Sequence, residues 1–501
     1  MNHLNTGYTS FSTAYSRRRF LELAFGVGVV SILGCDSNED VSSAIKPFGT
    51  KKVLPDLSQD TLNRFVQSFD GKIVMPSDSS YESLRRTWNY KYDKHPGMIA
   101  VCANVDDVRR TVAFASENQL LLAVRGGGHS MAGYSSCNGG ITLILSNLNT
   151  VTVDKKNNKA EILGGTIIGS IDFKLSEYGL ATPGASAATV GYGGFATGGG
   201  RATISPKYGL ACDNIVGAEI VTADGELRNV SMESDPDLFW AIRGGGGNYG
   251  VITRFTVQAH SLSKVVAGKL VFPFKNASDI LKKIRDQVQS VPDFLYVAPA
   301  LAGTPDGPAF AVNLLFCGPK EQAETTIARY REMGNAVADT ITELPYLNTQ
   351  GWFPGPPIGT ATEGCSGFFP VFTDEIIDAM ITAADSGPSA FAIPCFSNHG
   401  ALADQRYDNN AFPLRMKGVD FFAMGFWTSP TDRERTEKWA RDLWLSVAAS
   451  AESSFVNGFF KGNSVDALAS YRDKYQKLAA IKARYDPDNL FSQNVNILPA
   501  N

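Results

Sequence analysis

The sequence of 501 residues lacks several patterns that would assign it to a class directly. Its seven cysteines include no CxxC pair, which argues against a cysteine-held metal site. No basic block follows the N-terminal region and the net charge is −4, which argues against a nucleic-acid partner. The absence of internal repeats and low-complexity tracts excludes repeat architectures. The chain is therefore read as an ordinary globular protein without metal, of two or three domain-sized units.

A long hydrophobic run is also missing. The apolar stretch Leu23–Leu33 is too short to span a bilayer comfortably. It follows Ser16–Leu21, which resembles the twin-arginine export consensus, and it ends at Cys35 in a segment that resembles a bacterial lipobox. We therefore expect residues 1–35 to direct export across the bacterial inner membrane, and we expect a periplasmic or cell-envelope protein whose membrane association is a lipid at Cys35. The alternative is an ordinary cleaved signal in which Cys35 has no role.

The rest of the chain divides by composition and pattern. Residues 36–80 are expected to form a tether and the start of the first domain, which continues through 81–264 as short strands alternating with helices. Residues 265–454 have fewer glycines and are expected to form a separate α+β unit, and residues 455–501 a helical C-terminal module. Several of the remaining cysteines are expected to be buried thiols: Cys102, Cys137, Cys212, Cys317, Cys365 and Cys395.

Glycine is abundant, with 48 residues, and most of the excess lies in clusters between 126 and 250. Three glycines, Gly126 to Gly128, follow the strand-like segment Leu120–Val124, and His129 comes next. Successive glycines expose backbone N–H groups to which a polyphosphate can bind. This run therefore predicts a phosphate-binding loop with an imidazole beside it.

A second cluster, Gly191 to Gly200, contains a GxGxxA match. A dinucleotide-binding βαβ unit would place such a match between an apolar strand and a helix. Here Pro183–Ala188 precede it and more glycines follow, so a Rossmann loop is the weaker interpretation. Several glycine loops spread over more than a hundred residues instead indicate a long cofactor lying between two subdomains.

These motifs, in their order, resemble the FAD-binding domain of the vanillyl-alcohol-oxidase/PCMH superfamily and the C-terminal module of the berberine-bridge-enzyme-like members. The matching residues are Arg125–Ser130, Gly133, Gly198–Gly200, Tyr208–Leu210, Asp213, Asn214, Arg243–Gly247, Tyr249–Val251, Ala411–Pro413, Arg415, Trp427, Tyr471, Tyr475, Leu478, Lys482, Tyr485–Pro487 and Asn489–Phe491. The resemblance implies an α+β fold in which a two-part FAD-binding domain carries an inserted α+β substrate domain, an antiparallel sheet covered by helices.

The resemblance also implies the cofactor site. His129 occupies the position that bonds covalently to the 8α-methyl group of FAD, and Ala187 stands where some relatives have a second attaching cysteine. We therefore expect covalent FAD with a single attachment. The residues expected to bind FAD are Arg125, Gly126, Gly127, Gly128, His129, Ser130, Gly133, Val190, Gly191, Gly193, Gly194, Gly198, Gly199, Gly200, Asp213, Asn214, Gly250, Val251 and Asn494.

The segment that supplies the catalytic base in many relatives has a different sequence here. Many of them use a tyrosine in a Tyr-x-Asn-Tyr segment, and here the segment is Phe455-Val456-Asn457-Gly458. Asp420, at the start of a strand-like run, and His399 are the two candidates that remain. The alternative for Asp420 is a solvated cap at the end of a strand, and the alternative for His399 is a side chain that only forms hydrogen bonds.

The function expected is an FAD-linked oxidoreductase that takes hydride from an alcohol carbon of a sugar or secondary metabolite. In the family the middle residue of a Thr-x-Gly triplet faces the site where dioxygen approaches the flavin, and here it is the small residue Val190. This favours an oxidase with dioxygen as electron acceptor. The alternatives are a dehydrogenase that uses a quinone or a protein acceptor, and a catalytically silent flavin-binding lipoprotein.

Overall fold

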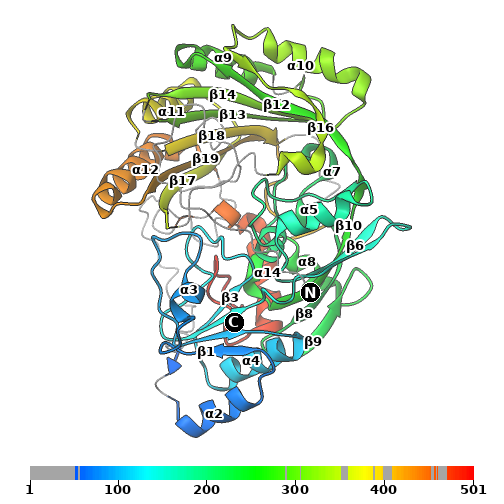
Figure 1. The fold of residues 1–501 in the computed structure, drawn as a ribbon, viewed down its shortest axis with the longest axis vertical. Helices are drawn as coiled ribbons and strands as arrows, with labels where there is room; N and C mark the ends of the chain where they lie inside the picture. Colours follow the sequence, from blue (N-terminus) through cyan, green and yellow to red (C-terminus); the bar gives the residue numbers. More distant parts are fainter. Residues whose placement is uncertain are drawn as a thin grey trace.

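The structure is a computed structural model. It describes residues 51–54, 57–287, 290–304, 306–350, 359–387, 390–398, 409–452, 456–458, 460 and 471–501, with 390–398 and 456 described by their backbone. Two of the expectations above, the export signal with Cys35 and the candidate base His399, lie outside the described residues, as does Phe455. The described chain forms two lobes, drawn one above the other in Figure 1.

The first lobe begins with a four-stranded sheet in the order β1-β2-β4-β3, built from β1 (Lys72–Val74), β2 (Met98–Val101), β3 (Leu122–Arg125) and β4 (Ile141–Ile144). The helices of this part are α2 (Gln59–Gln67), α3 (Tyr81–Arg85) and α4 (Val105–Glu117). Helix α4 starts where the Asn104 side chain accepts a hydrogen bond from the Asp107 N–H. Its Val108, Val112 and Ala115 lie three or four residues apart and form one apolar face in the core of this sheet.

A five-stranded antiparallel sheet completes the first lobe. Its order is β5-β6-β10-β8-β9, from β5 (Val151–Asp154), β6 (Lys159–Leu163), β8 (Ile215–Val221), β9 (Leu227–Val230) and β10 (Val251–Gln258). A short pair, β7 (Leu180–Ala181) and β11 (His260–Ser261), lies beside it. The connecting helices are α5 (Ile168–Ser176), α6 (Tyr192–Thr197), α7 (Ser205–Tyr208), η2 (Ala211–Asn214), α8 (Pro236–Ile242) and η3 (Gly246–Asn248).

The second lobe is one antiparallel sheet. Its strands are β12 (Lys264–Phe272), β13 (Leu295–Gly303), β14 (Ala309–Phe316), β15 (Ala338–Asp339), β16 (Thr342–Pro345), β17 (Ala361–Phe369), β18 (Ala390–Asn398) and β19 (Gly418–Trp427). The order is β15-β12-β14-β13-β18-β19-β17, and β16 pairs with β12. The longer helices are α9 (Ala277–Gln287), α10 (Ala323–Arg331), α11 (Asp374–Ser386) and α12 (Arg433–Val447). Short 3₁₀ turns connect the elements: η4 (Phe274–Asn276), η6 (Lys320–Gln322), η7 (Tyr346–Thr349), η10 (Pro430–Asp432), η11 (Ala448–Ser450) and η12 (Val456–Gly458).

Alternate residues of strand β19 show how this sheet separates two cores. Phe421 and Ala423 join the core formed with helices α9 to α12, which cover the outer face of the sheet (Figure 1). Phe422 and Met424 join a second core that includes Ile204 of the first lobe. Because successive side chains of a strand point to opposite faces, the inner face of the sheet packs on the first lobe.

The chain then returns to the first lobe through η13 (Arg472–Lys474) and α14 (Tyr475–Tyr485). The buried Lys482 ammonium donates to the Asn248 carbonyl at 2.8 Å and to the Phe491 carbonyl at 3.1 Å, and it pairs with Asp486 at 2.6 Å. The first lobe is therefore made of two pieces with the sheet lobe inserted between them. This confirms the predicted α+β class with an inserted, helix-covered antiparallel sheet.

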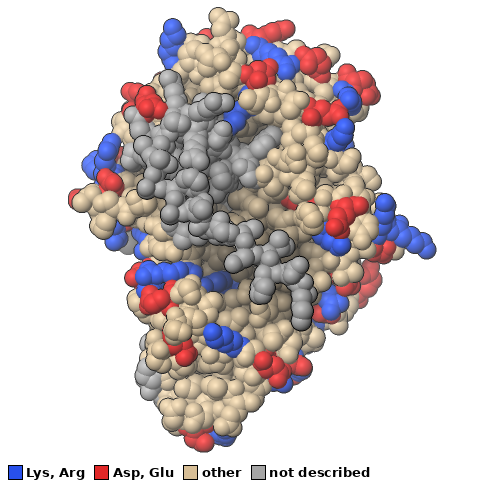
Figure 2. Space-filling view, viewed as in Figure 1, with Lys and Arg blue, Asp and Glu red and all other residues tan. Residues whose placement is uncertain are grey.

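Two further expectations concern the surface and the thiols. The cysteines that the structure describes with their side chains are buried and unpaired, as expected for Cys102, Cys137, Cys212, Cys317 and Cys365. On the face shown in Figure 2, Lys and Arg side chains are interspersed with Asp and Glu. Among the described helices, none has the length and apolar character needed to cross a bilayer.

Candidate active site

A cavity of about 310 Å³ lies in the first lobe, and its wall combines residues from two distant parts of the chain, 122–252 and 457–495. Twelve of the residues predicted to bind FAD line it: Gly126, Gly127, Gly128, His129, Ser130, Val190, Gly191, Gly193, Gly194, Gly250, Val251 and Asn494. The C-terminal piece adds Tyr471, Phe491, Gln493 and Val495, and Asn457 comes from the end of the inserted lobe. Residues 300 or more positions apart in the sequence therefore meet around one space.

Two of the glycine loops touch each other through their backbones. A Cβ atom at Gly127 would lie 2.2 Å from the Gly191 nitrogen, and one at Gly191 would lie 2.1 Å from the Gly127 nitrogen. Any side chain at either position would push the loops apart, so glycine is required by close approach of backbone to backbone. The contact fixes the predicted phosphate-binding loop Gly126–Gly128 against the start of helix α6.

Two other glycines of the wall have the opposite property. A Cβ at Gly194 or at Gly247 would meet no described protein atom within 4 Å, although both residues line the cavity. Their hydrogens therefore border open space, and that space is kept clear of side chains. A wall of bare backbone suits an elongated, phosphate-bearing ligand better than a small apolar one.

His129 lies partly buried in the wall, with its ring stacked on that of Trp88. The two ring centroids are 5.3 Å apart and the planes are inclined by 23°. Burial lowers the pKa of His129 to about 4, so the imidazole is neutral near pH 7. A neutral imidazole has a nitrogen lone pair available for bond formation.

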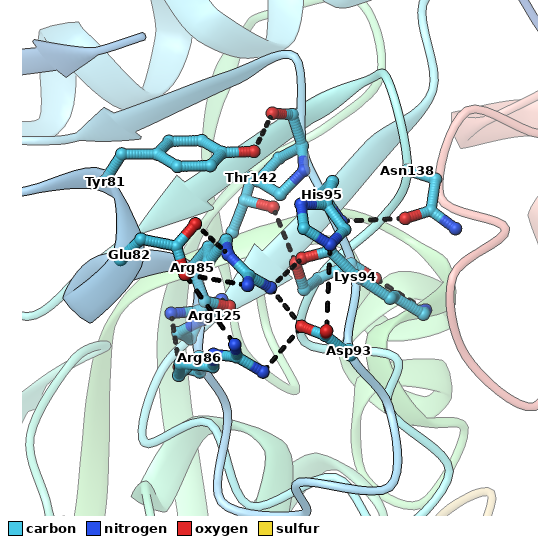
Figure 3. Close-up of polar contacts among 12 residues, drawn as sticks. Tyr81, Glu82, Arg85, Arg86, Asp93, Lys94, His95, Arg125, Asn138 and Thr142 are labelled. Carbon is cyan, nitrogen blue, oxygen red and sulfur yellow. Dashed lines mark hydrogen bonds and ion pairs between the residues drawn. The ribbon is translucent and has the colours of Figure 1, made fainter. Parts of the chain in front are cut away.

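Arg125, the first residue of this loop, is buried and lies behind the wall. Its guanidinium donates to the carbonyl groups of Arg85 at 3.0 Å, Arg86 at 3.1 Å and Ser135 at 3.0 Å. Figure 3 shows the same cluster, in which Arg85 lies between Glu82 and Asp93. Burial lowers the pKa of Arg125 to about 10, which still leaves it charged at neutral pH. Arg125 thus holds the loop in shape from outside the cavity.

The other predicted glycines that do not line the cavity shape its surroundings. Gly133 has a φ of +71°, and a Cβ there would lie 2.5 Å from the ring of Tyr92. Gly198 leaves room for Asn457, whose side-chain amide donates to the Phe195 carbonyl at 2.7 Å. Gly199 and Gly200 have φ values of +114° and +75°, so the chain bends sharply just before Arg201.

Asp213 and Asn214 are structural in the arrangement observed. The Asp213 carboxylate binds the buried Arg415 guanidinium, with one contact of 2.9 Å, and accepts a hydrogen bond from Asn410 at 2.7 Å. The Asn214 amide donates to the carbonyl groups of Tyr208 and Leu210, and its oxygen lies 2.6 Å from His260. The Asp213 contacts fasten η2 to the segment that contains Arg415, and the Asn214 contacts fasten it to residues 208–210 and to β11.

Asp420 lies on the inner face of the inserted sheet, with no exposed surface. It forms an ion pair with Arg201, which lines the cavity. Asp420 itself is not among the lining residues, so the structure brings it to the site through Arg201. The other candidate base, His399, lies outside the described residues.

Sequence reasoning missed several residues of the wall. Arg201 carries the one permanent charge among the described lining residues, and the cavity also receives Tyr134, Thr197 and Asn248. Burial raises the pKa of Tyr134 to about 12, so its phenol stays protonated. The only signal in the sequence for Arg201 is its position directly after three glycines. Asn457 belongs to the segment that differs from the Tyr-x-Asn-Tyr pattern of the relatives, and the sequence assigns it no function.

The fold and the cavity agree with the class that comparison with known proteins gives: an FAD-linked oxidoreductase with a two-part cofactor domain. Residues 96–231 match the family described as an FAD binding domain, and residues 467–498 match the family described as berberine and berberine like. The two matched segments contain the glycine loop with His129 and the returning helix α14.

Individual relatives agree. The chain is 29% identical over 464 residues to (R)-6-hydroxynicotine oxidase of Paenarthrobacter nicotinovorans, covering 86% of this chain and 97% of that one. The crystal structure of 6-hydroxy-D-nicotine oxidase from Arthrobacter nicotinovorans superposes with a TM-score of 0.79 at 28% identity, over 86% of this chain and 98% of that one. Xylooligosaccharide oxidase from Myceliophthora thermophila shares the fold, with a TM-score of 0.78 at 20% identity, over 88% of this chain and 100% of that one. The chain is therefore similar over most of its length to FAD-linked oxidoreductases, and its C-terminal segment matches the berberine-like family.

The residues present fit FAD. The wall at Gly194 and Gly247 leaves open space that a single Cβ would enter, and the Gly126–Gly128 loop offers bare backbone. FAD bound there would supply a flavin ring that accepts hydride. The protein supplies the fixed walls, the neutral imidazole of His129 and the Arg201 guanidinium. No cysteine is among the described residues of the wall, and Ala187 lies in the loop before Val190, whose N–H donates to the Ala187 carbonyl.

Proposed function

We propose that this protein is an oxidase that removes hydride from an alcohol carbon of a small molecule and passes the electrons to dioxygen. The observation that carries the proposal is the glycine-walled cavity with His129 and Val190 in one wall. A sugar or a secondary metabolite is the proposed substrate. Similarity to the FAD-linked oxidoreductases supports the redox chemistry.

FAD is proposed to be bound covalently, by His129 alone. The partly buried, neutral imidazole in the wall supports this assignment, and the alanine at 187 supports a single bond. Denaturing electrophoresis tests it, because covalent flavin stays with the protein as a fluorescent band. His129→Ala should release all the flavin, and flavin that remains attached in that variant contradicts the assignment.

Asp420 is proposed to accept the hydroxyl proton of the substrate. Its ion pair with Arg201 supports a position next to the cavity, since a substrate hydroxyl that binds the Arg201 guanidinium would approach the same carboxylate. His399 remains the second proposed candidate.

The acceptor is proposed to be dioxygen because Val190 lines the cavity and is small. The test is to reduce the bound flavin anaerobically with a panel of alcohols and then to mix it with aerated buffer. Bleaching by any alcohol excludes a silent binding protein. Rapid reoxidation that slows at least tenfold in Val190→Leu supports the oxidase, because packed walls respond to one added methylene. Slow reoxidation of the unmodified protein, with fast transfer to a quinone, would assign it to the dehydrogenases.

We further propose export to the cell envelope with a lipid at Cys35, supported by the twin-arginine-like and lipobox-like segments. Mass spectrometry of the envelope fraction tests this. A mature chain that begins at lipid-modified Cys35 is the expected result. An unmodified Cys35, or a chain that begins elsewhere, contradicts the anchor.

A further inference from the structure

Residues 84–92, here named the strap, run across the loop that carries His129. The backbone N–H of Trp88 donates to the Gly128 carbonyl at 3.1 Å, and the Trp88 ring stacks on the His129 ring. The Asn89 side chain donates to the Met131 carbonyl at 2.9 Å. Backbone on both sides of His129 is therefore held by neighbouring residues of one segment.

The strap is also fastened at its start. The carbonyl groups of Leu84, Arg85 and Arg86 accept hydrogen bonds from the Arg125 guanidinium. Arg85 is in turn paired with Glu82 and Asp93, the cluster drawn in Figure 3. The hydrogen bond and charge of Arg85 lower the pKa of Asp93, so the ion pairs of this cluster persist to a lower pH than an ordinary aspartate would allow.

The far side of the strap binds the inserted lobe. Asn89 exchanges two hydrogen bonds with the backbone of Thr362 in β17, of 3.1 and 3.0 Å, and the Tyr90 N–H donates to the Thr360 carbonyl at 3.3 Å. Lys91 forms ion pairs with Glu363 of β17 and with Glu437 of α12, the latter at 3.0 Å. Both lobes therefore fix the strap, and the strap fixes the ring that stacks on His129.

We propose that Trp88 is a positioning residue for attachment of the flavin to His129, held in place by the strap from both lobes. A stacked neighbour restricts the rotation of an imidazole about its side-chain bonds, and bond formation requires a defined approach of the nitrogen. The inference rests on the proposed covalent function of His129 and adds the residue that orients it.

The His129 imidazole nitrogen forms a bond to the 8α carbon, and a C–H bond of the 8α-methyl group breaks. The protons of that C–H and of the imidazole N–H are released, and the electron pair reduces the flavin ring by two electrons. Dioxygen, the proposed acceptor, restores the oxidised ring and becomes hydrogen peroxide. The role of Trp88 is confined to holding the imidazole during the first of these events.

The experiment compares three variants for total flavin and for the fraction that stays with acid-denatured protein, after incubation of the purified protein with FAD. Trp88→Leu removes the ring, Trp88→Phe keeps a smaller one, and Tyr90→Leu removes a ring from the same strap without touching His129. We expect Trp88→Leu to retain total bound flavin within twofold while its covalent fraction forms at least tenfold more slowly. Trp88→Phe should attach flavin faster than Trp88→Leu but at least twofold more slowly than the unmodified protein, and Tyr90→Leu should match the unmodified protein.

Several outcomes overturn the proposal. One is covalent attachment in Trp88→Leu at the unmodified rate. Should that variant fail to fold, Trp88→Phe decides: we expect at least a twofold slower attachment, and an unchanged rate refutes the role. Complete release of flavin from the denatured unmodified protein also overturns the inference, yet leaves an FAD-linked oxidase intact. Absence of any bound FAD would instead refute the proposed function.

Discussion

Among single residues, Asp172 of helix α5 illustrates how burial alone can set a protonation state. Its carboxyl group is buried; Gln350 donates to one oxygen, and the other has no hydrogen-bond partner among the described residues. Burial raises the pKa of Asp172 to about 7, while the hydrogen bond from Gln350 opposes the rise. Gln350 also donates to the carbonyl of Ala185, a residue of the cavity wall, at 2.9 Å.

This raised pKa gives a testable pH dependence. Between the unfolded pKa near 3.8 and the folded value of about 7, the folded protein holds a proton that the unfolded chain has lost. Stability is therefore highest below the lower value and falls as pH rises toward 7. Asp172→Asn mimics the protonated form, and each pKa unit is worth about 1.4 kcal/mol. In urea unfolding we expect the variant to be more stable by over about 1 kcal/mol at pH 8, with the gain disappearing near pH 4. The exposed Asp385→Asn is the control, and an equal gain in both variants would refute the assignment.

The Arg201–Asp420 pair carries a second prediction at this scale. Losing a positioned proton acceptor typically costs about 10²–10⁴ in rate. Asp420→Asn should slow anaerobic flavin reduction by such a factor while the flavin stays bound. Because the two side chains act as a unit, adding Arg201→Met should make the double variant little worse than Asp420→Asn alone. Near-normal flavin reduction in Asp420→Asn would remove the residue from the mechanism.

At the scale of elements, helix α6 combines structural and ligand-binding demands in six residues. Gly194 lies inside this helix, where alanine is more stable than glycine by about 0.5–1 kcal/mol. A Cβ there meets no described protein atom, so the fold accepts it. The same Cβ would project from the wall into the cavity in which FAD is proposed to bind. Gly194→Ala should therefore raise the melting temperature of flavin-free protein and weaken FAD binding at least tenfold, as measured by calorimetry and by flavin titration.

Two results would contradict this prediction. Unchanged FAD affinity in Gly194→Ala would show that the open space at Gly194 is not used by the cofactor. A loss of stability would show that the helix needs glycine for itself. Gly127→Ala is the contrasting control, because its Cβ would strike the Gly191 backbone and both stability and FAD binding should fall.

Elements differed in how far the sequence could predict them. The strand-like segments Val151–Asp154 and Ala309–Phe316 coincide with strands β5 and β14, since each has turn signals or sharp polarity changes at both ends. The helical pattern that begins at Asn276 starts one residue before helix α9, because Asn276 is the last residue of a 3₁₀ turn and the helix begins at Ala277. The glycine loops of the cavity were predictable because glycine signals backbone that something approaches closely. Arg201 was not, since an arginine gives no periodic signal and its partner Asp420 is 219 positions away.

The whole molecule depends on a first lobe made from two distant pieces. Phe491, Gln493, Asn494 and Val495 line the cavity, and the buried Lys482 joins the returning helix to Asn248. Deleting residues 491–501 should therefore abolish FAD binding and lower the melting temperature of the first lobe by many degrees. Deleting only the exposed Asn501 should change neither. Flavin absorbance of the purified proteins measures the effect, and full flavin content in the longer deletion would contradict the two-piece site.

Because the cavity is joined from distant pieces, the order of synthesis determines when FAD can bind. The His129 loop is synthesised more than 360 residues before Asn494 and Val495, which complete the wall of the cavity. Until then the cavity lacks one wall, and Lys482 has no Asn248 carbonyl to bind. A nascent chain that lacks Asn494 and Val495 thus cannot retain FAD. A chain stalled on the ribosome before residue 491 should be colourless, and a translational error in the codons for residues 491–495 would waste all the synthesis that precedes them.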